Sequence, residues 1–271
     1  MTPVLRCALP LLMVSLVAAG GSAKNVKATA AEVRANAVAP SLGAAGSFAV
    51  VGSSTVTNTG ATIVTGDLGL SPGTSVTGFP PGTVTGTIHA ADATALAAQN
   101  AVTTAYNALA GQACDSVLTG QNLGGMTLTP GVYCFGNSAQ LTGTLTLNGQ
   151  GNPGAVWVFQ IGSTLTTAAG SSVVFTNSGQ ACGAFWQVGS SATLGTTTSF
   201  AGNILAQISI TLNNGASSSG GLFAQTGAVT LNSNNVSTVG SCGAVPALPQ
   251  VAVWALLAAL LAVGFFILSR H

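Results

Sequence analysis

The stretch TLNNGASSSGGLFAQTGAVTL, from Thr211 to Leu231, begins and ends with the same dipeptide, Thr-Leu. This dipeptide recurs along the chain, starting at Thr127, Thr146, Thr164, Thr193, Thr211 and Thr230, so that successive starting positions differ by 19, 18, 29, 18 and 19. A period of this length is typical of a solenoid, in which each repeat forms one turn and stacks on the next. Short apolar runs separated by Gly- and Asn-rich bends predict about three strands per turn, and the long interval predicts an inserted loop around TNSGQAC.

Alternation along a strand predicts which side chains face outward. Each Leu of the Thr-Leu pairs should point into the solenoid, while the Thr and the residue after the Leu should point out. Successive turns stack ~4.8 Å apart, so equivalent side chains should form straight columns on a flat face. The residues predicted to form this face are Thr127, Thr144, Thr146, Thr164, Thr166, Thr193, Thr211, Asn213 and Thr230. A second series at intervals of 19, which predicts a rival face, consists of Ser199, Ser218 and Ser237. Thr also suits exposed strand positions in general, so the pattern by itself indicates the fold and leaves open whether the flat face binds a ligand.

One segment departs from the strand pattern. The stretch HAADATALAAQNAVTTAYNALAG, from His89 to Gly111, carries apolar residues at helical spacing, namely Ala91, Ala95, Ala98, Val102, Ala105 and Leu109. We expect a helix over about residues 90–110, with Asp92 near its positive end and Gly111 after its last turn. Such a helix would be ~30 Å long, the height of about six stacked turns, so it should lie along the solenoid and cover one face. The aromatic residues Trp157, Phe159 and Trp186 are predicted to be core or helix contacts rather than a ligand platform.

The predicted solenoid, residues 41–245, is nearly without charge. Its only formal charges are Asp67, Asp92 and Asp115, and His89 is its only histidine. Binding of nucleic acid requires Lys and Arg to neutralise phosphates, so nucleic acid is excluded as a partner. Three scattered carboxylates do not make an acid–base pair, and no GxSxG elbow accompanies the histidine. We therefore expect no enzyme, no catalytic residue, no metal site and no cofactor, with structural roles for these four residues.

The two ends of the chain predict export. Arg6, the apolar run LPLLMVSLVAAG and the small residues GSA predict a secretory signal over residues 1–23, followed by a linker over residues 24–40. Residues 251–268 are uncharged, mostly apolar and followed by Arg270, and the run is long enough to predict a membrane helix. With VPALPQ before it, the segment 246–271 looks like the C-terminal sorting tails of exported bacterial proteins, which a processing enzyme often removes; a permanent membrane anchor is the alternative. We expect an extracellular or cell-surface monomer.

Four cysteines remain once the predicted signal is removed. An even number in an exported chain predicts two disulfides, for which three pairings are possible. On proximity in the sequence alone, we expect Cys114 to pair with Cys134 and Cys182 with Cys242.

The long stretch LGAAGSFAVVGSSTVTNTGATIVTGDLGLSPGTSVTGFPPGTVTGTIHAADA, from Leu42 to Ala93, resembles the opening signature of the microbial ice-binding protein family. LTPGVYCF, LTGTLTLNGQG, FQIGSTLTT and FAGNILA continue the resemblance, which covers residues 41–239. It implies a right-handed β-solenoid of triangular cross-section with one long helix beside it. It also implies a discontinuous order of turns, in which the N-terminal strands form one end of the stack and the chain then crosses by the helix. One flat face is implied to adsorb to ice.

The composition suits an ice crystal surface as the partner. Ice is an uncharged, periodic array of donors and acceptors, and columns ~4.8 Å apart with residues ~7 Å apart along a strand come close to its repeats. Thr offers a hydroxyl, a methyl and a restricted χ1, whereas Lys and Arg are long, mobile and strongly hydrated. The alternative is a cell-surface adhesin or matrix protein whose hydroxylated face binds polysaccharide or neighbouring cells.

Overall fold

The computed structural model describes residues 37–240 and 242, all within the compact unit 34–271. These residues form short strands in three sheets, one α-helix, α1 (Ala93–Ala110), and two 3-10 helices, η1 (Gly43–Ala45) and η2 (Ala181–Gly183). The predicted signal 1–23, most of the predicted linker and the predicted tail 246–271 lie outside the described residues. Within the described part of the chain, no helix is both long and apolar enough to cross a membrane.

Sheet A has nine strands and is the side of the solenoid on which the helix lies. In spatial order its strands are β7 (Ile88–Ala90), β4 (Asp67–Leu70), β1 (Phe48–Gly52), β22 (Leu222–Ala224), β19 (Asn203–Ala206), β16 (Ala184–Val188), β13 (Trp157–Ile161), β10 (Gly131–Phe135) and β8 (Ser116–Val117).

Sheets B and C form the other two sides. Sheet B consists, in order, of β11 (Ala139–Leu141), β14 (Leu165–Thr167), β17 (Ala192–Leu194), β20 (Ile210–Leu212), β23 (Val229–Asn232), β2 (Thr55–Thr59) and β5 (Ser75–Thr77). Sheet C consists of β6 (Thr83–Val84), β3 (Ile63–Thr65), β24 (Asn235–Ser237), β21 (Ser217–Ser219), β18 (Ser199–Ala201), β15 (Ser172–Thr176), β12 (Thr144–Asn148) and β9 (Thr127–Leu128).

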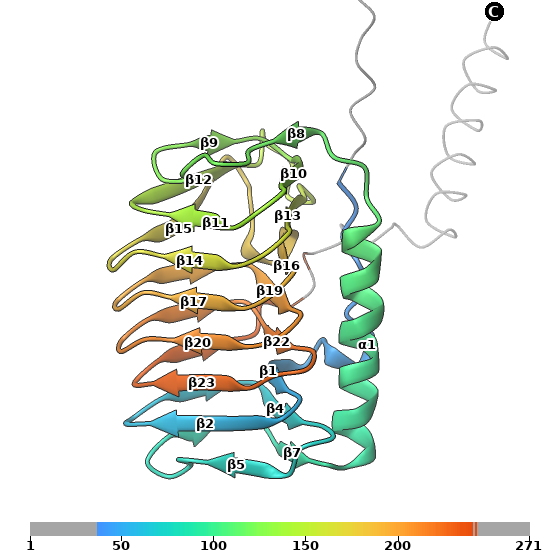
Figure 1. Ribbon diagram of the computed structural model, residues 1–271, viewed down its shortest axis with the longest axis vertical. Helices are drawn as coiled ribbons and strands as arrows, with labels where there is room; N and C mark the ends of the chain where they lie inside the picture. Colours follow the sequence, from blue (N-terminus) through green and yellow to red (C-terminus); the bar gives the residue numbers. More distant parts are fainter. Residues whose placement is uncertain (1–36, 241, 243–271) are drawn as a thin grey trace, which may run out of the picture. The chain divides into compact units, whose positions relative to one another are not determined.

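The strand pairings are parallel, and three strands, one from each sheet, make one turn (Figure 1). The β-solenoid with a flanking helix is therefore confirmed. The order of turns is discontinuous, as the resemblance implied: β1, β2 and β3 pair with β22, β23 and β24, which lie near the other end of the described chain. Figure 1 shows α1 running along the stack from the end that holds β7 towards the end that holds β8, which the chain reaches after the helix. The helix and the residues that follow it thus carry the chain from one end of the solenoid to the other.

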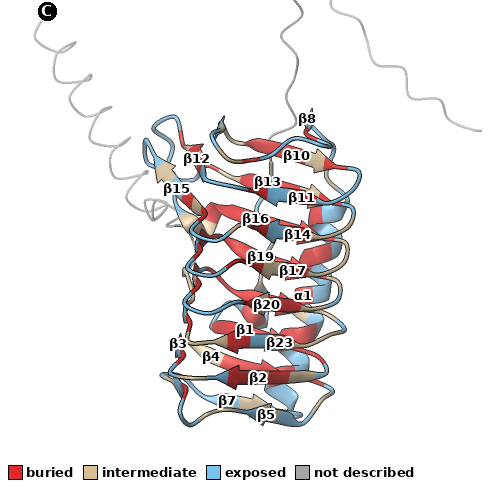
Figure 2. Ribbon diagram, turned by 60° about the vertical axis from the view of Figure 1, so that its left-hand side comes forward, coloured by how far each residue is buried: buried red, intermediate tan, exposed pale blue. Residues whose placement is uncertain are grey.

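The interior of the solenoid is apolar because every second side chain of each strand points inward. Leu165, Leu194, Leu212 and Leu231, which belong to the Thr-Leu repeats, are all at most 1% exposed. Figure 2 shows this alternation as buried and accessible residues along the strands of sheet B. The prediction that these leucines face the core is confirmed.

The large aromatic residues also belong to this interior. The rings of Phe159 and Trp186 stack with centroids 3.8 Å apart, and Trp157 is fully buried in the same cluster. Of the two roles predicted for them, core packing is correct and helix contact is not. The side chains that meet α1 point the other way from sheet A, and include Val158, Phe185, Leu205 and Phe223.

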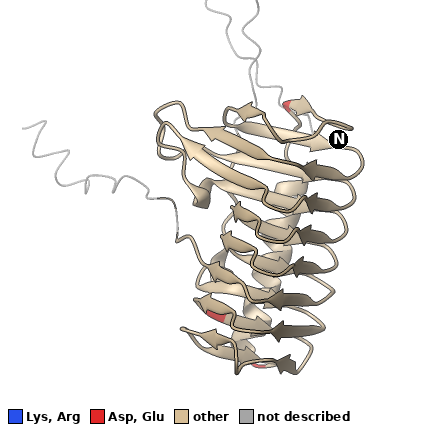
Figure 3. Cartoon of the chain, turned by 90° about the vertical axis from the view of Figure 1, so that its left-hand side faces the viewer, with Lys and Arg blue, Asp and Glu red and all other residues tan. Residues whose placement is uncertain are grey.

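Charge is sparse throughout the described residues. Asp67, Asp92 and Asp115 are the only charged residues between positions 37 and 242. Figure 3 accordingly shows acidic positions but no basic one on the described chain. Asp115 accepts a hydrogen bond from the backbone N–H of Val132 at 2.8 Å, and Asp67 accepts one from that of Thr87 at 2.9 Å. Both carboxylates satisfy backbone donors near strand ends, which is the structural role predicted for them.

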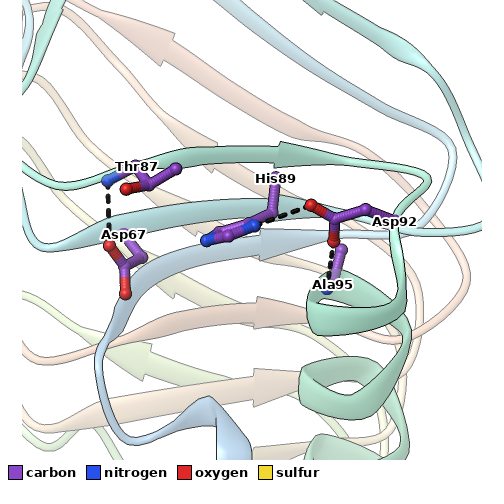
Figure 4. Close-up of polar contacts among 5 residues, drawn as sticks. All are labelled: Asp67, Thr87, His89, Asp92 and Ala95. Atoms are coloured by element: carbon purple, nitrogen blue, oxygen red, sulfur yellow. Dashed lines mark hydrogen bonds and ion pairs between the residues drawn. The ribbon is translucent and has the colours of Figure 1, made fainter.

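Asp92 begins the helix (Figure 4). Its Oδ1 accepts a hydrogen bond from the backbone N–H of Ala95 at 2.7 Å, which makes it the N-cap, and its Oδ2 lies 2.7 Å from Nδ1 of His89. The ring of His89 packs against Phe48 of β1, with centroids 5.6 Å apart. These contacts join the start of α1 to β7, the end strand of sheet A, and to β1 in the body of the solenoid. Ala91, predicted as a helical residue, lies outside the helix with φ of 54° because the chain turns there.

Further polar contacts lock the helix onto sheet A. Gln99 donates its side-chain amide to the carbonyl oxygens of Ala224 and Gln225, at 3.1 and 2.7 Å. Gln160 donates in the same way to Leu109 and Gln112, both at 2.8 Å. Just after the C-terminal end of the helix, Gln112 forms two hydrogen bonds with the backbone of Val38. The last residues of the predicted linker therefore pack on the fold.

Both predicted disulfides are present. Cys114 is bonded to Cys134, and Cys182 is bonded to Cys242. The first ties the chain that follows the helix to β10 in the neighbouring turn. The second ties the C-terminal end of the described chain to η2.

We predict that Asp92→Ala lowers the melting temperature by a few degrees at neutral pH, because the N-cap and the contact with His89 are lost. The pKa of Asp92 is lowered from its ordinary value of 3.8, first by the hydrogen bond from Ala95 and then by His89. A lowered folded-state pKa stabilises the fold above the unfolded-state pKa, and this contribution is lost as the pH falls through the folded-state value. The gap in melting temperature between wild type and Asp92→Ala should therefore shrink below about pH 4. Thr94→Ala is the control, and an equal gap at pH 2 and pH 7 would contradict the assignment.

Candidate functional site

Sheet B carries a column of threonines on its outer face. Neighbouring strands place Thr166 beside Thr193, Thr193 beside Thr211, and Thr211 beside Thr230. The column continues across the chain discontinuity, since Thr230 pairs with Thr57 and Thr57 with Thr77. We call these six residues, Thr166, Thr193, Thr211, Thr230, Thr57 and Thr77, the threonine ladder. Parallel pairing spaces neighbouring residues of the ladder ~4.8 Å apart. In β11, the seventh strand of sheet B, Gln140 occupies the equivalent position beside Thr166.

A second hydroxyl-rich column lies two residues before the ladder. From the register of the strands it consists of Ser138, Thr164, Ser191, Ser209, Ala228, Thr55 and Ser75. Thr164 Oγ1 donates a hydrogen bond to Ser138 Oγ at 2.8 Å. On the other side of the ladder, two residues after it, Thr59 pairs with Asn232 and Asn213 follows Leu212. The outer face of sheet B therefore carries two columns of mostly hydroxyl-bearing side chains, with Asn213, Asn232 and Thr59 beside them at one edge.

This outer face is accessible to solvent and electrically neutral. All six ladder residues are exposed or half-buried, while the residues between the columns, such as Val56 and Ala192, are buried. None of the seven strands of sheet B contains a titratable side chain. A surface of this kind has no acid, base or metal ligand with which to perform chemistry. It can offer only hydroxyl groups, methyl groups and a regular spacing.

The edge of this face is held by buried polar side chains at the corner between sheets B and C. Asn234 donates its amide to the carbonyl oxygens of Asn213 and Ala216, both at 2.9 Å. Thr167 and Thr198 share a hydrogen bond of 2.8 Å between their hydroxyl groups, and Thr198 is fully buried. These contacts join adjacent turns in addition to the backbone ladder. They restrict the movement of one turn of sheet B relative to the next.

Three of the predicted face residues lie elsewhere. Thr127, Thr144 and Thr146 belong to sheet C, where Thr127 pairs with Thr146 and Thr144 pairs with Ser172. The prediction that they share a face with Thr193 and Thr211 is wrong. The chain has two insertions between sheets C and A, in the residues between β12 and β13 and between β15 and β16, where the repeat pattern predicted one. The step from Thr146 to Thr164, although it matches the repeat, therefore leads from sheet C to sheet B.

The remaining predicted residues are on sheet B, in different columns. Thr166, Thr193, Thr211 and Thr230 are in the ladder, whereas Thr164 is in the column before it and Asn213 is in the column after it. Thr57 and Thr77 were missed, because their partners in the ladder come from the opposite end of the chain. The alternation in TVTNT, which begins at Thr55, is the signal that could have indicated an outward Thr there.

The rival serine series does not form a column. Ser199 pairs with Ser217, and Ser237 pairs with Ser219, so each of these turns is one residue shorter than the series assumes. Ser218 is 2% exposed and points into the core.

Neither of the other two outer faces matches sheet B. The outer face of sheet C contains a cavity of about 230 Å³ bordered by Ser217, Ser219 and Asn235. The exposed apolar side chains of Ile63 and Val174 also interrupt the polar residues of this face. The outer face of sheet A packs against α1.

Comparison with known proteins agrees with this geometry. Residues 50–237 match the family described as ice-binding-like. The chain belongs to this family. The match to the ice-binding-like family starts in β1 and ends in β24, so it takes in all three sheets and the crossing helix.

Individual members of the ice-binding-like family are similar over the same region. An ice-binding protein of Nostoc sp. (strain HG1) is 58% identical over 197 residues, which cover 72% of this chain and 73% of that protein. The crystal structure of an ice binding protein from an Antarctic biological consortium is similar with a TM-score of 0.73 and 48% identity, covering 75% of this chain and 92% of that one. An ice-binding protein from the Antarctic ascomycete Antarctomyces psychrotrophicus gives a TM-score of 0.73 and 42% identity, covering 75% of this chain and 100% of that one.

The register makes a prediction about stability. Thr193→Tyr should change the free energy of unfolding by less than about 1 kcal/mol, because the side chain is on the surface and Tyr suits exposed strand positions. Ser218→Tyr should cost roughly 3 kcal/mol or more, because the ring must enter a packed interior. Denaturant unfolding of both variants measures the difference. Equal stability of the two variants would mean that Ser218 does not face the core.

Proposed function

We propose that this protein adsorbs to ice through the outer face of sheet B. The observation that carries the proposal is the threonine ladder, in which six consecutive turns present the same side chain in register. The similar proteins of Nostoc, of the Antarctic consortium and of Antarctomyces are all called ice-binding proteins. The family to which this chain belongs is therefore one of ice-binding proteins and not one of enzymes.

The outer face of sheet B resembles an ice surface in two respects, namely its regular spacing and its lack of charge. Along the stack, hydroxyl groups repeat every ~4.8 Å, and across the face the columns are ~7 Å apart, because side chains on one face of a strand are two residues apart. Water held by these hydroxyl groups can take positions close to those of a growing ice layer. The Thr methyl groups limit the number of competing water positions. Because Thr is β-branched, the side chain has little rotamer freedom to lose on adsorption.

Adsorption of a rigid face has a direct consequence for ice growth. A molecule held on the crystal prevents water from joining the lattice beneath it, so the surface advances only between adsorbed molecules. We therefore expect inhibition of ice growth and of recrystallisation. A polysaccharide ligand is less well suited, because within residues 37–240 and 242 every aromatic side chain is buried or half-buried and none offers a stacking platform.

We propose further that the protein works outside the cytoplasm. The predicted signal supports this, and so do the two disulfides, since disulfides persist mainly in oxidising compartments. Ice that threatens a cell forms first in the surrounding water, where such a protein would meet it.

We predict that Thr211→Tyr strongly reduces inhibition of ice recrystallisation. Thr211 is near the middle of the ladder, and a Tyr ring there would hold the flat face away from the ice over several turns. The protein concentration needed to stop recrystallisation should rise about tenfold, which corresponds to roughly 1.4 kcal/mol of lost binding.

The matched control is Ser219→Tyr on the exposed surface of sheet C. It adds the same ring to another strand of the same turn and should leave the activity unchanged. Loss of activity in Ser219→Tyr with full activity in Thr211→Tyr would assign the function to sheet C instead.

A further inference from the structure

An apolar cleft of about 580 Å³ opens beside the outer face of sheet A. Its residues include Phe48, Val156, Phe185, Phe223 and Val239. The volume is in the range of pockets that bind drug-sized molecules, which is also the size of a short peptide. Phe48, Phe185 and Phe223 also belong to the apolar cluster under α1 and are at most 3% exposed, so the cleft borders that cluster beside the helix.

The polar groups in the cleft are few. Asn203 is 3% exposed, and its Oδ1 accepts a hydrogen bond from the backbone N–H of Gly221 at 3.0 Å. Its Nδ2 has no hydrogen-bond acceptor among the described residues, so it is available to a carbonyl group that enters the cleft. None of the described residues that line the cleft is charged. An occupant should therefore be uncharged and mainly apolar, with at least one carbonyl oxygen.

The C-terminal end of the described chain is at the cleft. Thr238, Val239, Gly240 and Cys242 all line it. Cys182, which also lines it, is bonded to Cys242 and holds that end in place. The sequence that follows Cys242 is therefore tethered at the cleft, and tethering gives a segment a high effective concentration at a nearby site.

The sequence that follows has the required chemistry. Residues 243–250, GAVPALPQ, contain no charge, and Val245 and Leu248 supply branched apolar side chains. Pro246 and Pro249 have no backbone N–H, so this segment needs fewer hydrogen-bond acceptors in an apolar site than an ordinary peptide does. Three residues span about 10 Å when extended, which brings Val245 within reach of the cleft from Cys242. The N-terminal residues before position 37 fit less well, because Glu32 and Arg34 are charged.

We propose that residues 245–249 occupy this cleft, with Val245 and Leu248 against the apolar side chains of sheet A and a backbone carbonyl group accepting from Asn203. The chain then leaves the solenoid on the side of sheet A, and sheet B stays free of its own C-terminal segment. A protein held at its C-terminus would accordingly keep the threonine ladder accessible. The proposal does not depend on ice binding, since it concerns a different face.

Photochemical cross-linking in the full chain, held in mild detergent, tests the proposal. A photoreactive benzophenone amino acid replaces Leu248, and mass spectrometry locates the bonds that form on irradiation. The cross-links should fall on residues that line the cleft, such as Val156 and Val239. Cross-links to sheet B or sheet C, or only between two copies of the chain, would overturn the proposal.

Two variants of the cleft supply the control. Val239→Asp places a carboxylate among the apolar groups and should lower the yield of the cross-link by about fivefold, because an unpaired charge would have to be buried. Gly154→Asp also places a carboxylate at the cleft, but from an exposed loop, where an added Cβ meets no atom closer than 3.4 Å. With two variants at different positions, misfolding of one of them does not decide the result. The matched control is Val174→Asp on sheet C, which should leave the yield unchanged. Equal yields in all three variants would also overturn the proposal, whereas inhibition of recrystallisation should be the same in all of them.

Discussion

The parallel hydrogen-bonded register between successive turns is the constraint on which the rest of this structure depends. Parallel pairing fixes the distance from one turn to the next at ~4.8 Å and places equivalent residues side by side. Each turn then has the same arrangement as its neighbour, with apolar side chains pointing inward and small polar side chains pointing outward. Because the register passes without a break from β23 to β2, two segments from opposite ends of the chain make one continuous face. The side-chain contact from Thr57 to Thr230 spans 173 residues of sequence and yet joins adjacent turns.

The absence of charge follows from the same constraint. In a stack of identical turns, one charged residue in each repeat would place like charges directly beside one another, which is destabilising. Neutral Ser, Thr and Asn avoid this repulsion and still satisfy hydrogen bonds at the corners, as Asn234 and Thr198 do. The three Asp residues all satisfy backbone N–H groups instead, where one carboxylate suffices. The fold and the proposed ligand therefore favour the same composition.

The sequence predicted the architecture better than the site. The nearly constant spacing of the Thr-Leu pairs indicated a solenoid, helical spacing indicated α1, and alternation correctly placed the leucines of the repeats inside. Assignment of each Thr-Leu pair to a sheet failed for Thr127, Thr144 and Thr146, because the two insertions shifted the repeat by amounts that imitate its period. Thr57 and Thr77 could not be found by periodicity at all, since their partners follow from a discontinuous order of turns. Ser218 appeared equivalent to Ser199 only because the assumed spacing was one residue too long for that turn, in which Ser199 pairs with Ser217.

We propose that sheet B, and neither sheet A nor sheet C, is the face that meets ice. The fraction of protein taken up into slowly grown ice, compared between two double variants of equal charge, distinguishes sheet B from sheet C. Thr193→Lys with Thr211→Lys places mobile hydrated side chains on the ladder, and Ser199→Lys with Ser219→Lys places them on the exposed surface of sheet C. We expect the sheet B variant to be excluded from the ice and the sheet C variant to enter it as the wild type does. Uptake of the sheet B variant at the wild-type level, or exclusion of the sheet C variant alone, would contradict this proposal.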